Sequence, residues 1–171
     1  DPDKYSKTLR RYHKALWSKP SPGGQPFELD DTTRGSYLHH VSPLGEFFLA
    51  SDGVIPSFRW LRHIHEYVAD AQLQEFLRIG YTIGGMMVFP GNQIDGKWTM
   101  NQARGCTSQI RDRFDLTLEC IRRYYLGGDS PLSPVLRRYA HFVELFADFR
   151  GSVEFFLLQG LVPPAFTAGA L

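Results

Sequence analysis

The order of the hydrophobic patterns is the feature that most constrains how this sequence can fold. Strand-like runs occur at residues 37–41, 46–50 and 81–89, whereas apolar residues at helical spacing dominate the second half. Strands and helices are therefore segregated along the chain instead of alternating one by one, which favours an α+β fold over a wound parallel sheet. We predict a small antiparallel sheet from the N-terminal and central strands, packed against a mostly helical C-terminal half.

Turn residues indicate how the strands connect. Ser42-Pro43-Leu44-Gly45 separates the first two runs and predicts a hairpin. Asp95-Gly96 is a turn dipeptide, so we expect residues 97–103 to form a strand that pairs with 81–89.

Five further segments predict helices. Residues 5–17 form a short amphipathic pattern that ends at a Pro/Gly-rich stretch, and residues 57–79 are also helical. An apolar stripe runs through 110–125, and Ser133-Pro134 is typical of a helix start. Residues 153–162 are apolar nearly all round, which predicts a buried helix. The aromatic side chains after Ser133 recur at helical spacing, and we interpret them as core.

Length and composition indicate one ordinary globular domain. The chain has 171 residues, of which 43% are hydrophobic and 22% are charged. A domain of this size buries enough surface to need neither a metal nor a disulfide, so we predict a single domain over 1–171. The two cysteines, Cys106 and Cys120, are too few for a disulfide-stapled secreted module, which favours the cytoplasm.

Charge and hydropathy restrict the partners. No apolar run reaches the roughly 20 residues of a membrane span, so we expect no membrane partner. The formal net charge is +1, from 19 basic and 18 acidic residues. A protein that binds long nucleic acids usually carries a clear basic excess, and none is present. The oligomeric state is not defined by any pattern.

Motifs for metals, cofactors and nucleophiles are absent from the sequence. There is no C-x-x-C, H-E-x-x-H, G-x-S-x-G or phosphate-loop pattern, so we predict no metal site and no cofactor. His39 and His40 are adjacent in a strand-like run and face opposite sides of the sheet. Acid–base chemistry therefore has only single-residue candidates, which are His39, His40 and Tyr125.

The segment 101–123 carries the most informative polar residues. We expect Asn101 and Arg104 to stand at the end of a strand, with Gly105 allowing a sharp bend into the next helix. A helix N-terminus offers free backbone N–H groups, which bind phosphate or carboxylate. The hypothesis is an anion site formed by these three residues with Arg111 and Arg113. The alternative is that Arg104 simply pairs with Asp112 or caps a loop.

Arg113 poses a separate question, because the helical pattern places it on the broad apolar side. A half-buried arginine needs an acidic partner or a ligand anion, and an internal ion pair is the commoner outcome. Asp112 and Asp115 are poorly directed toward it at helical spacing, so we expect its partner to come from another segment.

Several segments spread over nearly the whole chain carry a resemblance to a known family. They are YHKALWSKP, YLHHVSPLGEFFLASD, YTIGGMMVFPGN, NQARG, IRDRFDLTLECIRRYYLG, SPLSPVLRRYAHF and FRGSVEFFLLQGLV. These segments resemble an uncharacterised bacterial protein family, classed as a domain of unknown function. The resemblance implies a bacterial origin and a single domain. It implies no catalytic residue, since that family has no assigned activity, and residues 163–171 depart from its pattern.

Three functions remain open at this point. The preferred hypothesis is a cytoplasmic domain that binds a small phosphate- or carboxylate-bearing ligand, such as a nucleotide, through the arginine cluster. The first alternative is a metal-independent nuclease or nucleotide-directed enzyme of a defence or toxin system. The second is a structural or protein-interaction domain whose arginines are all paired internally. The sequence leaves open whether the protein is an enzyme.

Overall fold

The strands form one antiparallel sheet in the order β1-β2-β3. The computed structural model describes residues 6–33, 35, 37–43, 45–54, 66–80 and 82–162. Within these ranges the strands are β1 (Leu38–Ser42), β2 (Gly45–Gly53) and β3 (Met86–Pro90). The helices are α2 (Lys7–Trp17), α4 (Asp70–Gly80), the short 3₁₀ helix η2 (Ile83–Gly85), α5 (Met100–Cys106), α6 (Phe114–Tyr125), α7 (Ser133–Arg138), α8 (Ala140–Glu144) and α9 (Phe149–Phe155). The predicted α+β fold is confirmed, with the helices concentrated in the second half.

The long central strand β2 holds the sheet together. Its first half pairs with β1, from Leu38↔Leu49 to Ser42↔Gly45, which confirms the predicted hairpin. Its second half pairs with β3, from Leu49↔Pro90 to Gly53↔Met86. Every residue of β3 is buried, which explains why its sequence is apolar without alternation.

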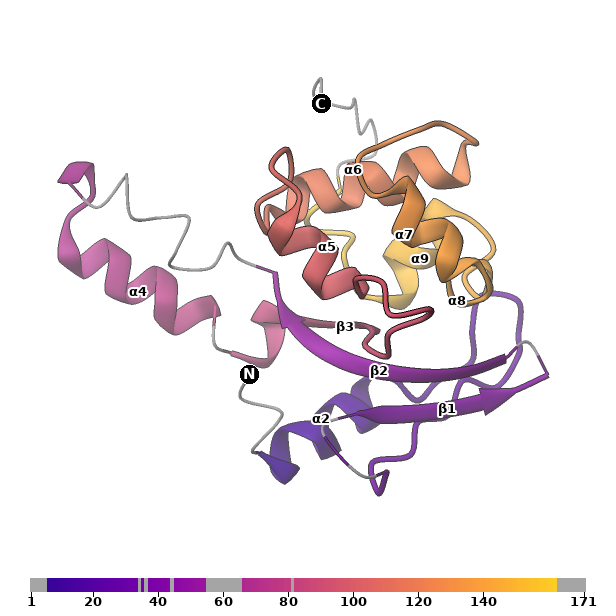
Figure 1. Ribbon diagram of the computed structural model, residues 1–171. Helices are drawn as coiled ribbons and strands as arrows, with labels where there is room; N and C mark the ends of the chain where they lie inside the picture. The colour runs from indigo at the N-terminus through magenta and orange to yellow at the C-terminus, as the bar shows by residue number, and fades with distance from the viewer. Residues whose placement is uncertain are drawn as a thin grey trace.

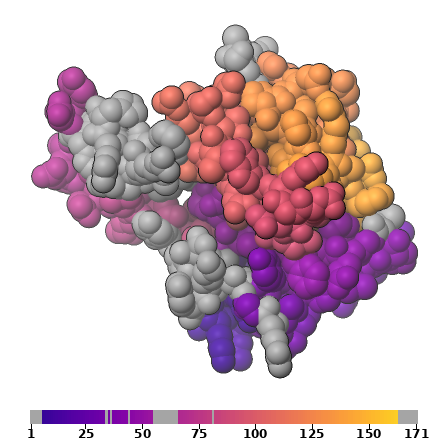
Figure 2. Space-filling model, viewed as in Figure 1, coloured from indigo at the N-terminus to yellow at the C-terminus, as the bar shows by residue number. Residues whose placement is uncertain are grey.

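The helices form layers on both sides of the strands. Figure 1 shows α5 to α8 above the sheet and α2 on the opposite side, while α4 projects away from the rest. In Figure 2 the red-to-yellow helical half lies directly on the purple strands, without an intervening gap. Within the described ranges, no helix is both long enough and apolar enough to cross a membrane.

Aromatic side chains make the contact between these layers. Phe146 is 1% exposed and its ring lies 5.2 Å from Phe142 and 4.9 Å from both Phe155 and Phe156, between ring centroids. Phe142 also meets Phe47 of β2 edge to face, at 5.7 Å. Such tilted and edge-to-face pairs stabilise a core beyond the area they bury. The interpretation of this aromatic stripe as core is confirmed.

Two expected elements are different in the structure. Residues 97–103 do not form a strand: Thr99 caps a helix there, accepting from Gln102 N (3.3 Å) while its own N–H donates to the Gln102 side chain (3.0 Å). This reciprocal capping box commits the segment to α5. The helix predicted over 153–162 ends at Phe155, and Leu157 follows with a left-handed φ of 58°.

Two further boundaries agree only in part, since residues 83–85 of the predicted strand 81–89 form η2 and β3 begins at Met86. Residues 57–65 and Tyr81 lie outside the described residues, and α4 confirms the later part of the predicted 57–79 helix. Ile110 lies in the turn before α6 but is fully buried, so the apolar stripe is continuous across the helix start.

The backbone of Ala147, between α8 and α9, provides a test of this fold. Ala147 is exposed and has a φ of 64°, a conformation that costs a side-chain-bearing residue roughly 1–2 kcal/mol. We expect Ala147→Gly to raise the free energy of unfolding by up to about 1 kcal/mol in urea denaturation, after the loss of chain entropy is subtracted. As the control, Ala15→Gly within α2 should lower it by about 1 kcal/mol. Equal losses in both variants would contradict the left-handed turn.

Candidate functional site

Arg104, the residue at the centre of the sequence hypothesis, lies fully buried in the last turn of α5. Its Nε donates to Thr117 Oγ1 of α6 at 3.1 Å. Its terminal nitrogens donate to the Asp52 carboxylate and to the carbonyl oxygens of Gly53 (3.3 Å) and Asp112 (3.4 Å). One guanidinium therefore joins the end of β2, α5, α6 and the loop between the two helices.

The surroundings of this guanidinium are apolar. The rings of Phe89 and Phe114 lie 5.3 and 5.7 Å from its central carbon, a distance at which aromatic faces attract cations. Asp52, whose side chain is 26% exposed, supplies the compensating charge. Burial raises the pKa of Asp52 to about 6, although the Arg104 charge acts in the opposite direction.

The other predicted residues of α5 also make internal contacts. Asn101 donates from Nδ2 to the Ser51 carbonyl at 3.3 Å, which attaches the start of α5 to β2. Gly105 faces the Asp112 side chain, whose Oδ1 would lie 3.0 Å from an added Cβ. The expectation that Asn101 and Arg104 end a strand ahead of a helix N-terminus was wrong, because both lie within α5.

Arg111 and Arg113 lie apart from this buried group. Arg111 is exposed in the loop, with a left-handed φ of 49°. Arg113 is 56% exposed and donates from Nε (3.2 Å) and a terminal nitrogen (2.5 Å) to Asp115. The expectation of a half-buried Arg113 with a partner from another segment was wrong, because Arg113 is the N-cap of α6 and not part of its apolar face. The internal ion pair itself is confirmed.

The histidines lie on the opposite edge strand. His39 Nε2 pairs with Glu46 Oε1 at 2.7 Å, and its ring stacks on Phe48 at 4.5 Å. His40 is 2% exposed and its Nδ1 bonds to the carbonyl oxygen of Glu28 at 2.8 Å. In the sheet order, β1 is separated by β2 from β3, the strand on which α5 packs.

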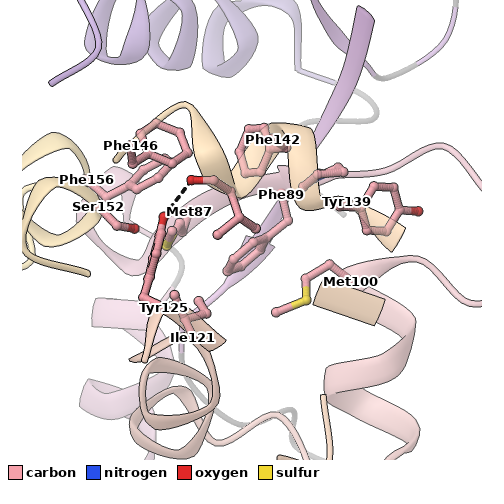
Figure 3. A pocket seen from close by; sticks show the side chains of 12 residues that line it. Met87, Phe89, Met100, Ile121, Tyr125, Tyr139, Phe142, Phe146, Ser152 and Phe156 are labelled. Carbon is pink, nitrogen blue, oxygen red and sulfur yellow. Dashed lines mark hydrogen bonds between the residues drawn. The ribbon is translucent and has the colours of Figure 1, made fainter. Parts of the chain in front are cut away.

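Tyr125 is partly buried and packs against the core. Figure 3 shows its ring among Met87, Ile121, Phe146 and other apolar side chains around a small internal cavity. Its hydroxyl donates to the carbonyl oxygen of Val143 at 2.6 Å. Burial raises the pKa of Tyr125, so the hydroxyl stays protonated near neutral pH. This environment is that of a structural tyrosine.

An open groove lies between α5, α7 and the loop before α5. Its volume is about 480 Å³, within the range of small-molecule pockets. Lys97 and Trp98 line it from the loop before α5, whereas Arg138 lines it from α7, together with the apolar Pro134 and Val135. The lining residues are Gly96, Lys97, Trp98, Ala103, Thr107, Pro131, Pro134, Val135 and Arg138.

The charged side chains that line this groove are all basic. Lys97 is exposed, and neither Lys97 nor Arg138 pairs with a carboxylate among the described residues. Arg138 donates to the Trp98 carbonyl at 2.8 Å, while its Nε is buried and has no hydrogen-bond partner in the described part of the chain. No lining residue is acidic. The groove therefore offers two positive charges to a ligand.

Sequence reasoning did not single out these residues. Arg138 was not among the predicted site residues, and Lys97-Trp98 were assigned to a strand. The Thr99/Gln102 capping spacing, T-x-x-Q, is the signal that identifies a helix start directly after Trp98. It would have placed Lys97 and Trp98 in the preceding loop, where side chains are free to contact a ligand.

A second open groove borders β1, with a volume of about 540 Å³. Its lining carries mixed charge, with Lys14 and His39 beside the carboxylates of Glu28 and Asp30. Across the described ranges, no group of three or more His, Cys, Asp or Glu side chains is placed to hold a metal ion.

Fold and site together define the class: an α+β domain with an internally neutralised core arginine and an open cationic groove. The chain belongs to a family described as a family of unknown function (DUF6994), which matches residues 1–168. Neither the curated proteins nor the solved structures contain a match to it.

The buried ion pair generates a pH-dependent prediction. Arg104→Met removes the donors of Asp52 and of two carbonyl groups, and we expect it to lower the free energy of unfolding by about 3–5 kcal/mol at about pH 8. The folded-state pKa of Asp52 is already raised to about 6, and it rises further without the Arg104 charge. Protonation then favours the folded variant, so the cost should shrink toward about pH 5.

Urea denaturation across this pH range measures the cost. The matched control is Arg113→Met, which removes an exposed ion pair and should cost less than about 1 kcal/mol without that pH trend. A cost for Arg104→Met that is independent of pH would contradict the coupling to Asp52.

Proposed function

We propose that this domain binds a small anionic ligand, bearing phosphate or carboxylate, in the groove between α5 and α7. The observation that carries the proposal is the lining of the groove, where Lys97 and Arg138 stand beside Trp98 and form no ion pair with a carboxylate in the described part of the chain. A cation that is not paired with a carboxylate can make charge-assisted hydrogen bonds to a ligand, which are about twice as strong as neutral ones.

This proposal keeps the predicted ligand class but moves the binding residues. In the arginine cluster, the Arg104 donors are used by Asp52, Thr117 and two carbonyls, and the Arg113 fork is used by Asp115. A ligand would have to displace those contacts and open the core. The groove requires no such rearrangement, because Lys97 and Arg138 line an open space and neither is paired with a carboxylate among the described residues.

The enzyme alternative has one observation in its favour. His39 is held by Glu46 at the edge of the second groove, an arrangement that orients an imidazole for proton transfer. The arginines required to stabilise a transition state are not among its partners, however, and His40 and Tyr125 each bond to a backbone carbonyl. Binding without chemistry therefore has the stronger support.

The cellular setting belongs to the same proposal. Cys106 and Cys120 are both free thiols, one exposed and one buried, which suits a reducing compartment. We place the domain in the bacterial cytoplasm on this basis and on the resemblance described above.

Isothermal titration with pyrophosphate, ribose phosphate and citrate tests the groove. We expect at least one anion to bind, with an affinity that falls as ionic strength rises. Lys97→Gln should weaken that binding about 10-fold or more, because one charge-assisted hydrogen bond is lost. The matched control is Lys7→Gln, an exposed lysine on α2 outside the groove, which should leave the affinity unchanged. Equal effects of both variants, or no binding of any anion, would refute the proposal.

A further inference from the structure

The aromatic wall of the groove has a role that charge alone does not explain. Trp98 is 51% exposed although tryptophan is among the largest apolar side chains. Its backbone is fixed on both sides, since its carbonyl accepts from Arg138 and the next residue, Thr99, caps α5. A rigidly mounted, half-exposed indole is a preformed stacking surface.

We propose that the ligand is a nucleotide, whose base stacks on Trp98 while its phosphate meets Lys97 and Arg138; this rests on the proposed function of the groove. Stacking on an aromatic side chain suits any base, because every base has a π-face. Phosphate suits an arginine and a lysine that are not paired with a carboxylate among the described residues. Lys97 is adjacent to Trp98 in the chain and Arg138 bonds to the Trp98 carbonyl, so a single small molecule can contact all three.

The apolar part of the lining fits the same ligand. Pro131, Pro134 and Val135 present apolar surface that can cover the second face of a base, and Thr107 adds a hydroxyl. A simple phosphate or carboxylate would leave this surface uncovered. The groove volume of about 480 Å³ suits a mononucleotide.

The small positive charge of the protein restricts how long a bound nucleic acid can be. The whole chain carries a formal net charge of +1. Binding along a strand depends on many phosphate contacts, each releasing counterions, whereas the groove provides two cations. The structure therefore points to a free nucleotide and not to an extended strand.

Comparison of ligand fragments tests this assignment in the intact chain. We expect AMP, GMP, CMP or UMP to bind about 10-fold or more tightly than ribose phosphate, with adenosine weaker than AMP. Binding should quench the fluorescence of Trp98. Trp98→Ala should remove the advantage of the nucleotide over ribose phosphate, and Trp98→Phe should keep much of it while losing the quench.

The possible failures are distinguishable. If ribose phosphate binds as tightly as all four nucleotides, the nucleotide assignment is overturned while the anion groove stands. If neither class binds, both proposals fail. Affinity that increases steadily with the length of an oligonucleotide would overturn the assignment in favour of a strand. Urea denaturation of Trp98→Ala, expected to resemble that of the wild type because its ring is half exposed, shows that a loss of binding is not a loss of fold.

Discussion

The arrangement of this domain depends on the burial of one positive charge. A guanidinium without solvent is strongly unfavourable unless its donors are satisfied, and the acceptors for Arg104 come from three separate parts of the chain. Asp52 brings the end of β2, Thr117 brings α6, and Asp112 brings the loop between α5 and α6. None of these segments can shift alone without leaving a donor or an acceptor unpaired. The angle of α5 against the sheet follows from this requirement.

The position of the residues that line the surface groove also depends on the buried Arg104. Because α5 is fixed by Arg104 at one end and by its Thr99 cap at the other, the residues just before the cap have a fixed position. Lys97 and Trp98 therefore stand at the mouth of the groove, and Arg138 of α7 reaches the Trp98 carbonyl across it. The buried Arg104–Asp52 ion pair and the surface groove are in this way connected through α5.

Local patterns predicted the features that depend on neighbouring residues. The β1–β2 hairpin and the aromatic core stripe follow from turn chemistry and from helical spacing, and both are present. Residues 97–103 were misassigned because the Asp95-Gly96 turn favoured a hairpin, and the competing T-x-x-Q cap was not weighed. The surroundings of Arg104 could not be predicted from neighbouring residues. The position of an arginine in the sequence does not reveal whether its side chain is buried, and Asp52, the partner of Arg104, is 52 residues away.

The distribution of charge separates paired arginines from the cations of the groove. Most guanidinium groups in the described part of the chain pair with a carboxylate: Glu119 alone receives Arg122 and Arg123, and Arg113 bonds to Asp115. The two opposite charges of such a pair largely cancel at a distance, so the pair attracts a charged ligand only weakly. The informative cations are those for which the described chain supplies no carboxylate, and Lys97 and Arg138 meet on one groove. In a chain of nearly zero net charge, unpaired positive charge at a concave surface is a stronger sign of anion recognition than any run of basic residues.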